Sequence, residues 1–276
     1  MAIDGSTDIY GIMGQPVAHS LSPAMHNAAF QALGLNKVYL PFAVADVAGA
    51  VAGFRALGVK GVSVTIPHKQ VIIPHLDSLD PVAGKIGAVN TLVLTGPLIH
   101  GLNTDWLGAN RALGETMDLK GKTVLLIGDG GAARAIGFGL LEAGARLLLA
   151  SRNQGKGAAL ASHLGCPWQP LEKAPDLTAD ALVNATAVGM TPQSDRTPVP
   201  MAALANFPVV MDIVYAPLET RLLKEARTTG CRVVDGLTML LYQGVAQFEL
   251  WTGQPAPIEV MRAILQQRLG HRHTMA

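Results

Sequence analysis

A glycine-rich turn between a strand and an alanine-rich helix limits the folds open to this chain more than any other feature. The apolar run Thr-Val-Leu-Leu-Ile at 123–127 leads into Gly-Asp-Gly-Gly-Ala-Ala-Arg at 128–134. Glycines in such a turn let a pyrophosphate approach the backbone, and the helix start offers free N–H groups and a positive dipole end. The spacing is G-x-G-G-x-x-R rather than G-x-G-x-x-G. We predict a Rossmann-type dinucleotide site here, with a merely tight turn as the alternative.

The end of the next strand bears on which dinucleotide would bind. NAD enzymes usually carry Asp or Glu about twenty residues after the glycines, where it accepts hydrogen bonds from the ribose 2′-OH. This chain has Ser151, Arg152 and Asn153 there, with Lys156 one turn later. Arg can hold a 2′-phosphate through two parallel hydrogen bonds, although such cations are also common on solvated surfaces. The pattern favours NADP over NAD.

Short apolar runs alternate with stretches of helical period along the whole chain, which indicates an α/β fold with parallel strands. We expect an N-terminal α/β domain at 1–105, a Rossmann-type dinucleotide-binding domain at 106–236, and C-terminal helices at 237–276 that return to the first domain. The predicted strands are 9–12, 37–42, 61–66, 89–94, 98–101, 123–127, 145–150, 181–184, 209–212 and 232–234. The predicted helices are 23–33, 46–56, 106–116, 132–142, 156–163, 239–251 and 258–269.

Composition excludes several classes of protein. Of the 276 residues 49% are hydrophobic and 15% charged, so a disordered chain is excluded. Net charge is +1 without a basic block, and we expect no nucleic-acid or membrane partner. Cys166 and Cys231 stand far apart without metal-type spacing, which predicts reduced thiols and no metal site. The first ten residues do not resemble a signal peptide, so a cytoplasmic location is expected.

Four segments of the first domain carry polar residues that a core has little reason to hold. Ser20 and Ser22 lie just before a predicted helix; Ser22 precedes a proline and could be only an N-cap, so Ser20 is the better ligand candidate. Thr65 and Lys69 follow an apolar strand, at the sheet edge where open α/β proteins bind ligands. His68 is expected to be a packing or solvent residue.

Two further segments place amides and an acid at strand ends or helix starts. Asn90 lies in Gly-Ala-Val-Asn-Thr, and Asp105 closes Asn-Thr-Asp. Asp105 could also serve only as the N-cap of the following helix.

Together these segments resemble the shikimate dehydrogenase family. The matching motifs are G-Q-P-V-A-H-S-L-S-P from Gly14, V-T-I-P-H-K from Val64, G-A-V-N-T from Gly87, N-T-D from Asn103, G-D-G-G-A-A-R-A from Gly128, S-R-N from Ser151, N-A-T from Asn184, D-I-V-Y-A-P-L-E-T from Asp212 and D-G-L-T-M-L-L-Y-Q from Asp235. The resemblance implies a substrate domain and an NADP domain, split by a cleft, and reversible reduction of 3-dehydroshikimate to shikimate. It leaves a homodimer open.

The resemblance also implies roles for individual residues. Lys69 and Asp105 would be the catalytic pair. The expected substrate residues are Ser20, Ser22, Thr65, Asn90, Tyr215 and Gln243. The expected cofactor residues are Gly128, Gly130, Gly131, Ala132 and Arg134 for the pyrophosphate, Ser151, Arg152 and Lys156 for the 2′-phosphate, and Thr186, Ile213 and Gly236 for the nicotinamide side.

Those residue types suit the chemistry of carbonyl reduction. A proton must reach the oxygen as hydride reaches carbon; Lys69 can supply it, and Asp105 can orient both the lysine and the substrate. Three positions depart from the family's pattern, namely Trp106 where glycine is common, Asp129, and Asn153 where threonine is usual.

Three alternatives remain open at this point. One is a quinate/shikimate or aminoshikimate dehydrogenase using NAD or NADP. Another is a non-catalytic ligand sensor, against which the retention of both Lys69 and Asp105 argues. The third is a different Rossmann-bearing dehydrogenase, such as a folate enzyme.

Overall fold

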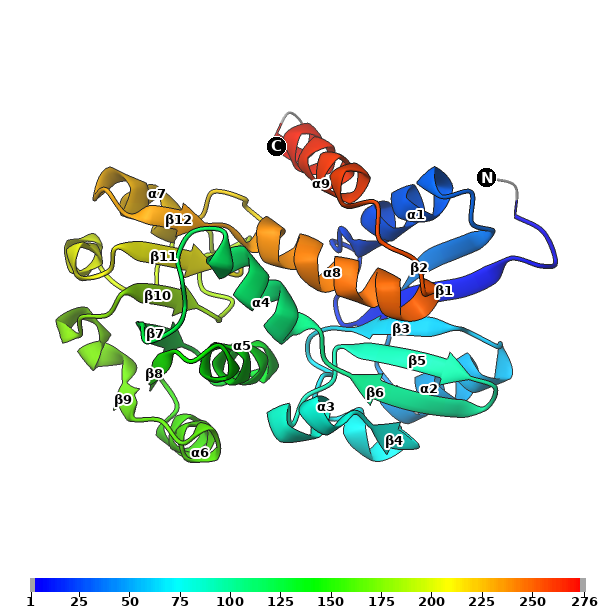
Figure 1. Ribbon diagram of the computed structural model, residues 1–276, viewed down its shortest axis with the longest axis horizontal. Coiled ribbons are helices and arrows are strands. Elements are labelled where there is room, and N and C mark those ends of the chain that lie inside the picture. The colour runs from blue at the N-terminus through cyan, green and yellow to red at the C-terminus, as the bar shows by residue number, and fades with distance from the viewer. Residues whose placement is uncertain (1–2, 274–276) are drawn as a thin grey trace. The chain divides into compact units, whose positions relative to one another are not determined.

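The computed structural model describes residues 3–273, which form two compact units (Figure 1). Of these residues, unit 1 holds 3–104 and 243–273, and unit 2 holds Asp105–Tyr242. Unit 1 is therefore discontinuous in sequence, whereas unit 2 is a single stretch of chain.

Unit 1 contains a mixed sheet in the order β2-β1-β3-β5-β6-β4. Strand β1 pairs in parallel with β2 and β3, and β5 pairs antiparallel with β3 and β6. The strands are β1 Asp8–Gly14, β2 Lys37–Ala43, β3 Gly61–Val64, β4 Ser78–Leu79, β5 Thr91–Thr95 and β6 Leu98–Leu102. The helices are α1 Ser22–Ala32, α2 Val47–Ala56, the 3-10 helix η1 Ile73–His75, α3 Pro81–Ile86, α9 Ile258–His273 and the part of α8 (Gly236–Thr252) from Gln243 onward.

Alternation along β1 gives unit 1 two packed faces, because successive strand residues point to opposite sides of a sheet. Met13 lies in the apolar cluster that contains Phe54 of α2. Tyr10 faces the other way and packs against Phe30 and Trp251, with ring centroids 5.4 and 5.5 Å away. Residues from the start and the end of the chain thus share one aromatic cluster.

Unit 2 contains an entirely parallel sheet in the order β12-β11-β10-β7-β8-β9. The strands are β7 Thr123–Ile127, β8 Arg146–Ser151, β9 Trp168–Pro170, β10 Ala181–Asn184, β11 Val209–Asp212 and β12 Arg232–Val234. The helices are α4 Asp105–Gly114, α5 Gly131–Glu142, α6 Gln154–Leu164, α7 Arg221–Thr228 and the start of α8, with 3-10 helices η2 Leu171–Asp176 and η3 Met201–Asn206.

Counted from β7 as the first strand, this order is the Rossmann order 3-2-1-4-5-6. The order reverses between β7 and β10, which lie side by side (Figure 1). Ligands of open parallel sheets bind beyond the carboxyl ends of the strands at such a reversal. The predicted α/β fold class with a Rossmann-type second sheet is confirmed.

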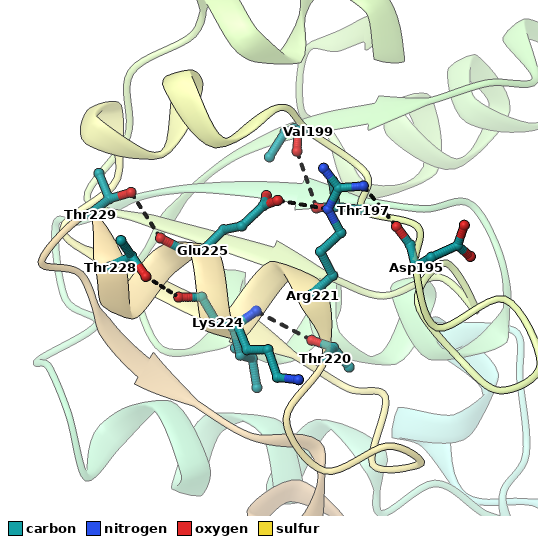
Figure 2. Close-up of polar contacts among 10 residues, drawn as sticks. Asp195, Thr197, Val199, Thr220, Arg221, Lys224, Glu225, Thr228 and Thr229 are labelled. Atoms are coloured by element: carbon teal, nitrogen blue, oxygen red, sulfur yellow. Dashed lines mark hydrogen bonds and ion pairs between the residues drawn. The ribbon is translucent and has the colours of Figure 1, made fainter.

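Helix α7 was not predicted from the sequence. Its N-terminus is capped by Thr220, whose hydroxyl oxygen accepts a hydrogen bond from the Leu223 N–H at 3.3 Å. Figure 2 shows Arg221 reaching both Glu225, one turn along the helix at 2.7 Å, and the carbonyl of Asp195 at 2.8 Å. Only Leu222, Leu223 and Ala226 of this helix are buried, so its apolar pattern is too sparse to stand out.

Three further observations concern membrane-spanning helices, the two cysteines and metal sites. Within residues 3–273, no helix has both the length and the apolar character needed to cross a membrane. Cys166 and Cys231 are unpaired, half-buried thiols. No group of three or more His, Cys, Asp or Glu residues gathers as a metal site in that part of the chain.

Candidate active site

The two serines expected near the substrate lie at the start of α1. The residue before this helix is Leu21, and no side chain caps it, so the interpretation of Ser22 as an N-cap is wrong. The Ser20 hydroxyl instead accepts a hydrogen bond from the Ser22 N–H at 3.2 Å. Ser22 is buried beside Tyr39 of β2. Burial raises the pKa of Tyr39, and its hydrogen bonds with Ser63 and Ser22 oppose this shift.

Thr65 and Lys69 follow β3, on a segment that contacts the end of β1. The Thr65 N–H donates to the Met13 carbonyl at 2.9 Å, and a Cβ at Gly14 would collide with the Thr65 side chain. The Lys69 carbonyl accepts from the Val89 N–H at 2.7 Å, one residue before Asn90. Unit 1 therefore brings together the segment that starts at Gly14, the Thr65–Lys69 segment and the Asn90 segment.

Asn90 is buried and held by several hydrogen bonds. Its side-chain oxygen accepts from the Thr104 N–H and the Thr91 hydroxyl, both at 2.7 Å. Its Nδ2 lies 3.4 Å from Oε1 of Gln243. Asp105 follows Thr104 directly, begins α4 and is 4% exposed.

Sequence reasoning missed several buried polar residues that support Asn90. Tyr39, Ser63 and Gln247 are each less than a tenth exposed and are joined by hydrogen bonds. A spacing of four places Gln247 one turn after Gln243 on the same face of a helix. That spacing was the signal available in the sequence.

The glycine turn after β7 combines a glycine at positive φ with a helix start that has no side-chain cap. Gly128 has a φ of +130°, and a Cβ there would lie 3.0 Å from the Ala185 carbonyl oxygen, so glycine lets the turn pass the end of β10. Helix α5 starts after Gly130 with no side-chain cap and no acid in its first turn, which leaves its N–H groups facing outward. Nε of Arg134 is buried without a hydrogen-bond partner among the described residues. These features fit a dinucleotide.

The turn after β8 holds the two predicted phosphate cations. Arg152 and Lys156 are both exposed, and Asn153 caps α6 by accepting from the Lys156 N–H at 2.9 Å. Ser151 is 3% exposed. Its hydroxyl donates to the Asn153 carbonyl at 3.2 Å and accepts from Trp168 Nε1 at 3.0 Å. Ser151 therefore shapes the turn, while the cations face solvent.

The three residues expected on the nicotinamide side follow adjacent strands. Thr186 lies beyond β10, Ile213 follows β11 directly, and Gly236 lies beyond β12. A Cβ at Gly128 would lie 3.2 Å from Cγ2 of Thr186, and one at Gly236 would collide with the Ile213 carbonyl. Unit 2 thus brings these residues together with the glycine turn; Tyr215, half-buried, follows two residues after Ile213.

A buried acid not singled out from the sequence ties these strand ends together. Asp212 is 0% exposed. It accepts hydrogen bonds from Asn184 Nδ2 at 2.9 Å, the Thr220 hydroxyl at 2.7 Å and the Val214 N–H at 3.1 Å. The Thr186 hydroxyl donates to Oδ1 of the same Asn184 at 2.7 Å. Burial raises the pKa of Asp212 from 3.8 to about 6, although the hydrogen bonds oppose the shift.

Trp106, the departure beside Asp105, has a packing role inside unit 2. Its ring meets Phe138 of α5 edge-on, with centroids 5.8 Å apart. A Cβ at Gly139 would lie 3.0 Å from the Trp106 Cβ, so α4 and α5 approach closely at this glycine. Among the other departures, Asn153 is the α6 cap and Asp129 is half-buried.

The fold and the site define a two-unit, nicotinamide-dinucleotide-dependent dehydrogenase. Residues 12–92 match the model of the shikimate dehydrogenase substrate binding domain, and residues 236–266 match that of the shikimate 5'-dehydrogenase C-terminal domain. A relative from Moorella thermoacetica, named shikimate dehydrogenase (NADP(+)), is 46% identical, with 97% of this chain and 96% of the relative covered. The chain belongs to the shikimate dehydrogenase family.

Solved structures agree with this membership. A shikimate dehydrogenase crystallised with NADP+ superimposes with a TM-score of 0.92 at 40% identity, covering 97% of this chain and 98% of the other. The Thermus thermophilus enzyme, in complex with NADP(H) and shikimate, gives a TM-score of 0.87 at 38% identity, with 95% and 99% covered.

Proposed function

We propose that the protein is an NADP-dependent shikimate dehydrogenase that interconverts 3-dehydroshikimate and shikimate. The observation that carries this is the 46% identity over nearly the full length to a relative of that name. Family membership fixes the class of reaction, and the site residues below are part of the proposal.

Substrate binding falls to side chains with hydroxyl, amide and phenol groups, which suit a ring that carries hydroxyls and a carboxylate. The buried amide of Asn90, close to Gln243, supports this because both can hydrogen-bond ring hydroxyls. The proposed substrate residues are Ser20, Ser22, Thr65, Asn90, Tyr215 and Gln243.

Carbonyl reduction requires a proton source at the substrate oxygen. In the proposal Nζ of Lys69 donates that proton, and the Asp105 carboxylate orients the lysine and accepts from a substrate hydroxyl. The nicotinamide, when bound, supplies the hydride to the carbonyl carbon. In the reverse direction Lys69 takes the proton back. The positive charge on Lys69 also stabilises the negative charge that develops on the oxygen.

In the proposal, different residues of unit 2 bind different parts of NADP. Gly128, Gly130, Gly131, Ala132 and Arg134 hold the pyrophosphate. Arg152 and Lys156 hold the 2′-phosphate, with Ser151 shaping their turn, and Thr186, Ile213 and Gly236 border the nicotinamide. The outward N–H groups of α5 and the unpartnered Arg134 Nε support this division.

Initial rates with shikimate and quinate, each with NADP+ and NAD+, test the proposal. Shikimate with NADP+ should give the highest kcat/KM. Lys69→Ala should lose most of kcat with a smaller change in KM, and Asp105→Asn should also lose kcat. Preference for quinate would favour the quinate/shikimate alternative; binding without turnover in all four pairings would favour a sensor and refute the enzyme.

The proposal extends to location and partners. Two unpaired thiols suit a reducing compartment, so we propose the cytoplasm. With a net charge of +1 and no basic block, we expect no nucleic-acid or membrane partner. Monomer and homodimer are the states that the proposal leaves open, and sedimentation of the intact protein distinguishes them.

A further inference from the structure

A continuous series of buried hydrogen bonds in unit 1 leads from Tyr39 to Asn90. The Tyr39 hydroxyl donates to Ser63 Oγ at 2.6 Å, and Ser63 donates to Gln247 Oε1 at 2.8 Å. Nε2 of Gln247 then donates to the Thr91 hydroxyl at 2.9 Å and to the Asn90 carbonyl at 3.1 Å. Tyr39, Ser63, Asn90, Thr91 and Gln247 are all buried.

The direction of these hydrogen bonds is fixed by the Asn90 carbonyl. A carbonyl oxygen can only accept, so the Gln247 amide must turn its NH2 group toward it and its oxygen toward Ser63. A flipped amide would set two acceptors against each other in a buried place, which is costly. Gln247 therefore has one favourable orientation.

That orientation passes to the Asn90 side chain through Thr91. The Thr91 hydroxyl accepts from Gln247 and so directs its own hydrogen to Asn90 Oδ1 at 2.7 Å. The Thr104 N–H donates to the same oxygen at 2.7 Å. With its oxygen held by two donors, Asn90 must present its NH2 group toward the Thr104 hydroxyl, 3.0 Å away, and toward Oε1 of Gln243, 3.4 Å away.

We infer that Gln247 is a positioning residue for substrate binding, acting through Thr91 to hold the Asn90 amide in its binding orientation. The inference rests on the proposed function, in which Asn90 and Gln243 contact shikimate. One face of α8 then supplies both a substrate ligand and, one turn later, the support for a second ligand. Such support lowers the entropy that Asn90 would lose when substrate binds.

Two substitutions that remove the coupling test this. Gln247→Met keeps a side chain of similar length without hydrogen-bonding groups, and Thr91→Val keeps the shape of threonine without its hydroxyl. Each should raise KM for shikimate by about tenfold, the size expected when one buried hydrogen bond is lost. KM for NADP+ should stay within about twofold of the wild-type value, the variation expected from a substitution with little effect on cofactor binding. Thr91→Ser retains the hydroxyl and should restore the wild-type KM for shikimate.

Leu265→Ala provides a matched control for general loosening of unit 1. Leu265 of α9 is 1% exposed, so its truncation should destabilise unit 1 while leaving both KM values unchanged. The inference is overturned if Gln247→Met and Thr91→Val keep the wild-type KM for shikimate, if Thr91→Ser behaves like Thr91→Val, or if Leu265→Ala raises that KM equally. A wild-type enzyme inactive on shikimate would instead refute the proposed function, and this inference with it.

Discussion

Replacing His26 by phenylalanine should make unit 1 markedly more resistant to acid. The His26 ring is 0% exposed, stacks on Tyr39 with centroids 4.6 Å apart and lies 5.2 Å from the Trp251 ring. Neither ring nitrogen has a hydrogen-bond partner within residues 3–273. The nearby Gln247 favours the protonated ring weakly, without hydrogen-bond geometry. The imidazole is therefore held neutral by burial.

Burial lowers the pKa of His26 from 6.5 to about 3. Between these values the unfolded chain binds a proton that the folded chain does not, so stability that is complete above pH 6.5 falls as the pH falls. At about pH 4.5, two units below the unfolded value, the loss is about 2.7 kcal/mol, since each unit corresponds to about 1.36 kcal/mol. His26→Phe abolishes this loss. It should also gain about 1 to 3 kcal/mol at neutral pH by removing unpartnered polar atoms.

Amide hydrogen exchange measured by mass spectrometry on peptides from β1 and α1 gives the unfolding free energy of unit 1 by itself. The difference between His26→Phe and wild type should widen by about 2.7 kcal/mol between about pH 7.5 and about pH 4.5. Asp212 titrates in the same range, but it belongs to unit 2 and is common to both proteins. His75→Phe, at an exposed ring, should keep the wild-type pH dependence. Parallel pH profiles for His26→Phe and wild type would refute the reasoning.

Three other substitutions probe unit 2. Arg152→Ala should raise KM for NADP+ at least about tenfold and leave KM for NAD+ unchanged, because only NADP carries the 2′-phosphate; equal changes in initial-rate measurements would contradict this. Gly128→Ala should weaken NADP+ binding at least about tenfold by calorimetry and lower unit 2 stability by about 1 to 3 kcal/mol, since φ is +130° and the new Cβ would lie only 3.0 Å from the Ala185 oxygen; wild-type affinity would count against a close-packed turn. In wild type, the raised pKa of Asp212 should lower unit 2 stability as pH rises from 3.8 to about 6, and Asp212→Asn should remove that slope in hydrogen exchange; an unchanged slope would assign it to another group.

The strands of unit 2 could be predicted closely because they are buried on both faces. Thr123–Ile127, Ala181–Asn184 and Val209–Asp212 are almost wholly apolar, and their observed limits match the prediction. Helix α7 was not predicted because charged residues cover most of its surface. Its cap, Thr220, cannot be told from a threonine in a loop by sequence alone.

The support of the candidate site could not be predicted, because it depends on residues far apart in sequence. Ser63 and Gln247 are separated by 184 positions, and only the folded unit shows that they form a hydrogen bond. The wrong interpretation of Ser22 has a local cause. Ser-Pro is a strong cap signal, but here the helix begins one residue early and Ser22 faces the buried Tyr39.

The discontinuity of unit 1 has a consequence for the order in which the protein can mature on the ribosome. Trp251 donates to the Leu92 carbonyl at 3.0 Å, and Phe248 packs on Phe30 with centroids 5.5 Å apart. Phe248 and Trp251 can therefore pack against unit 1 only after all of unit 2 has been translated, whereas unit 2 is translated as one uninterrupted stretch. Folding during synthesis would then reverse the usual N-terminal-first order. Until Gln243 and the residues after it emerge, the aromatic face of β1 has Phe30 of α1 against it but lacks Trp251, so the nascent chain exposes apolar surface that chaperones and aggregation can reach.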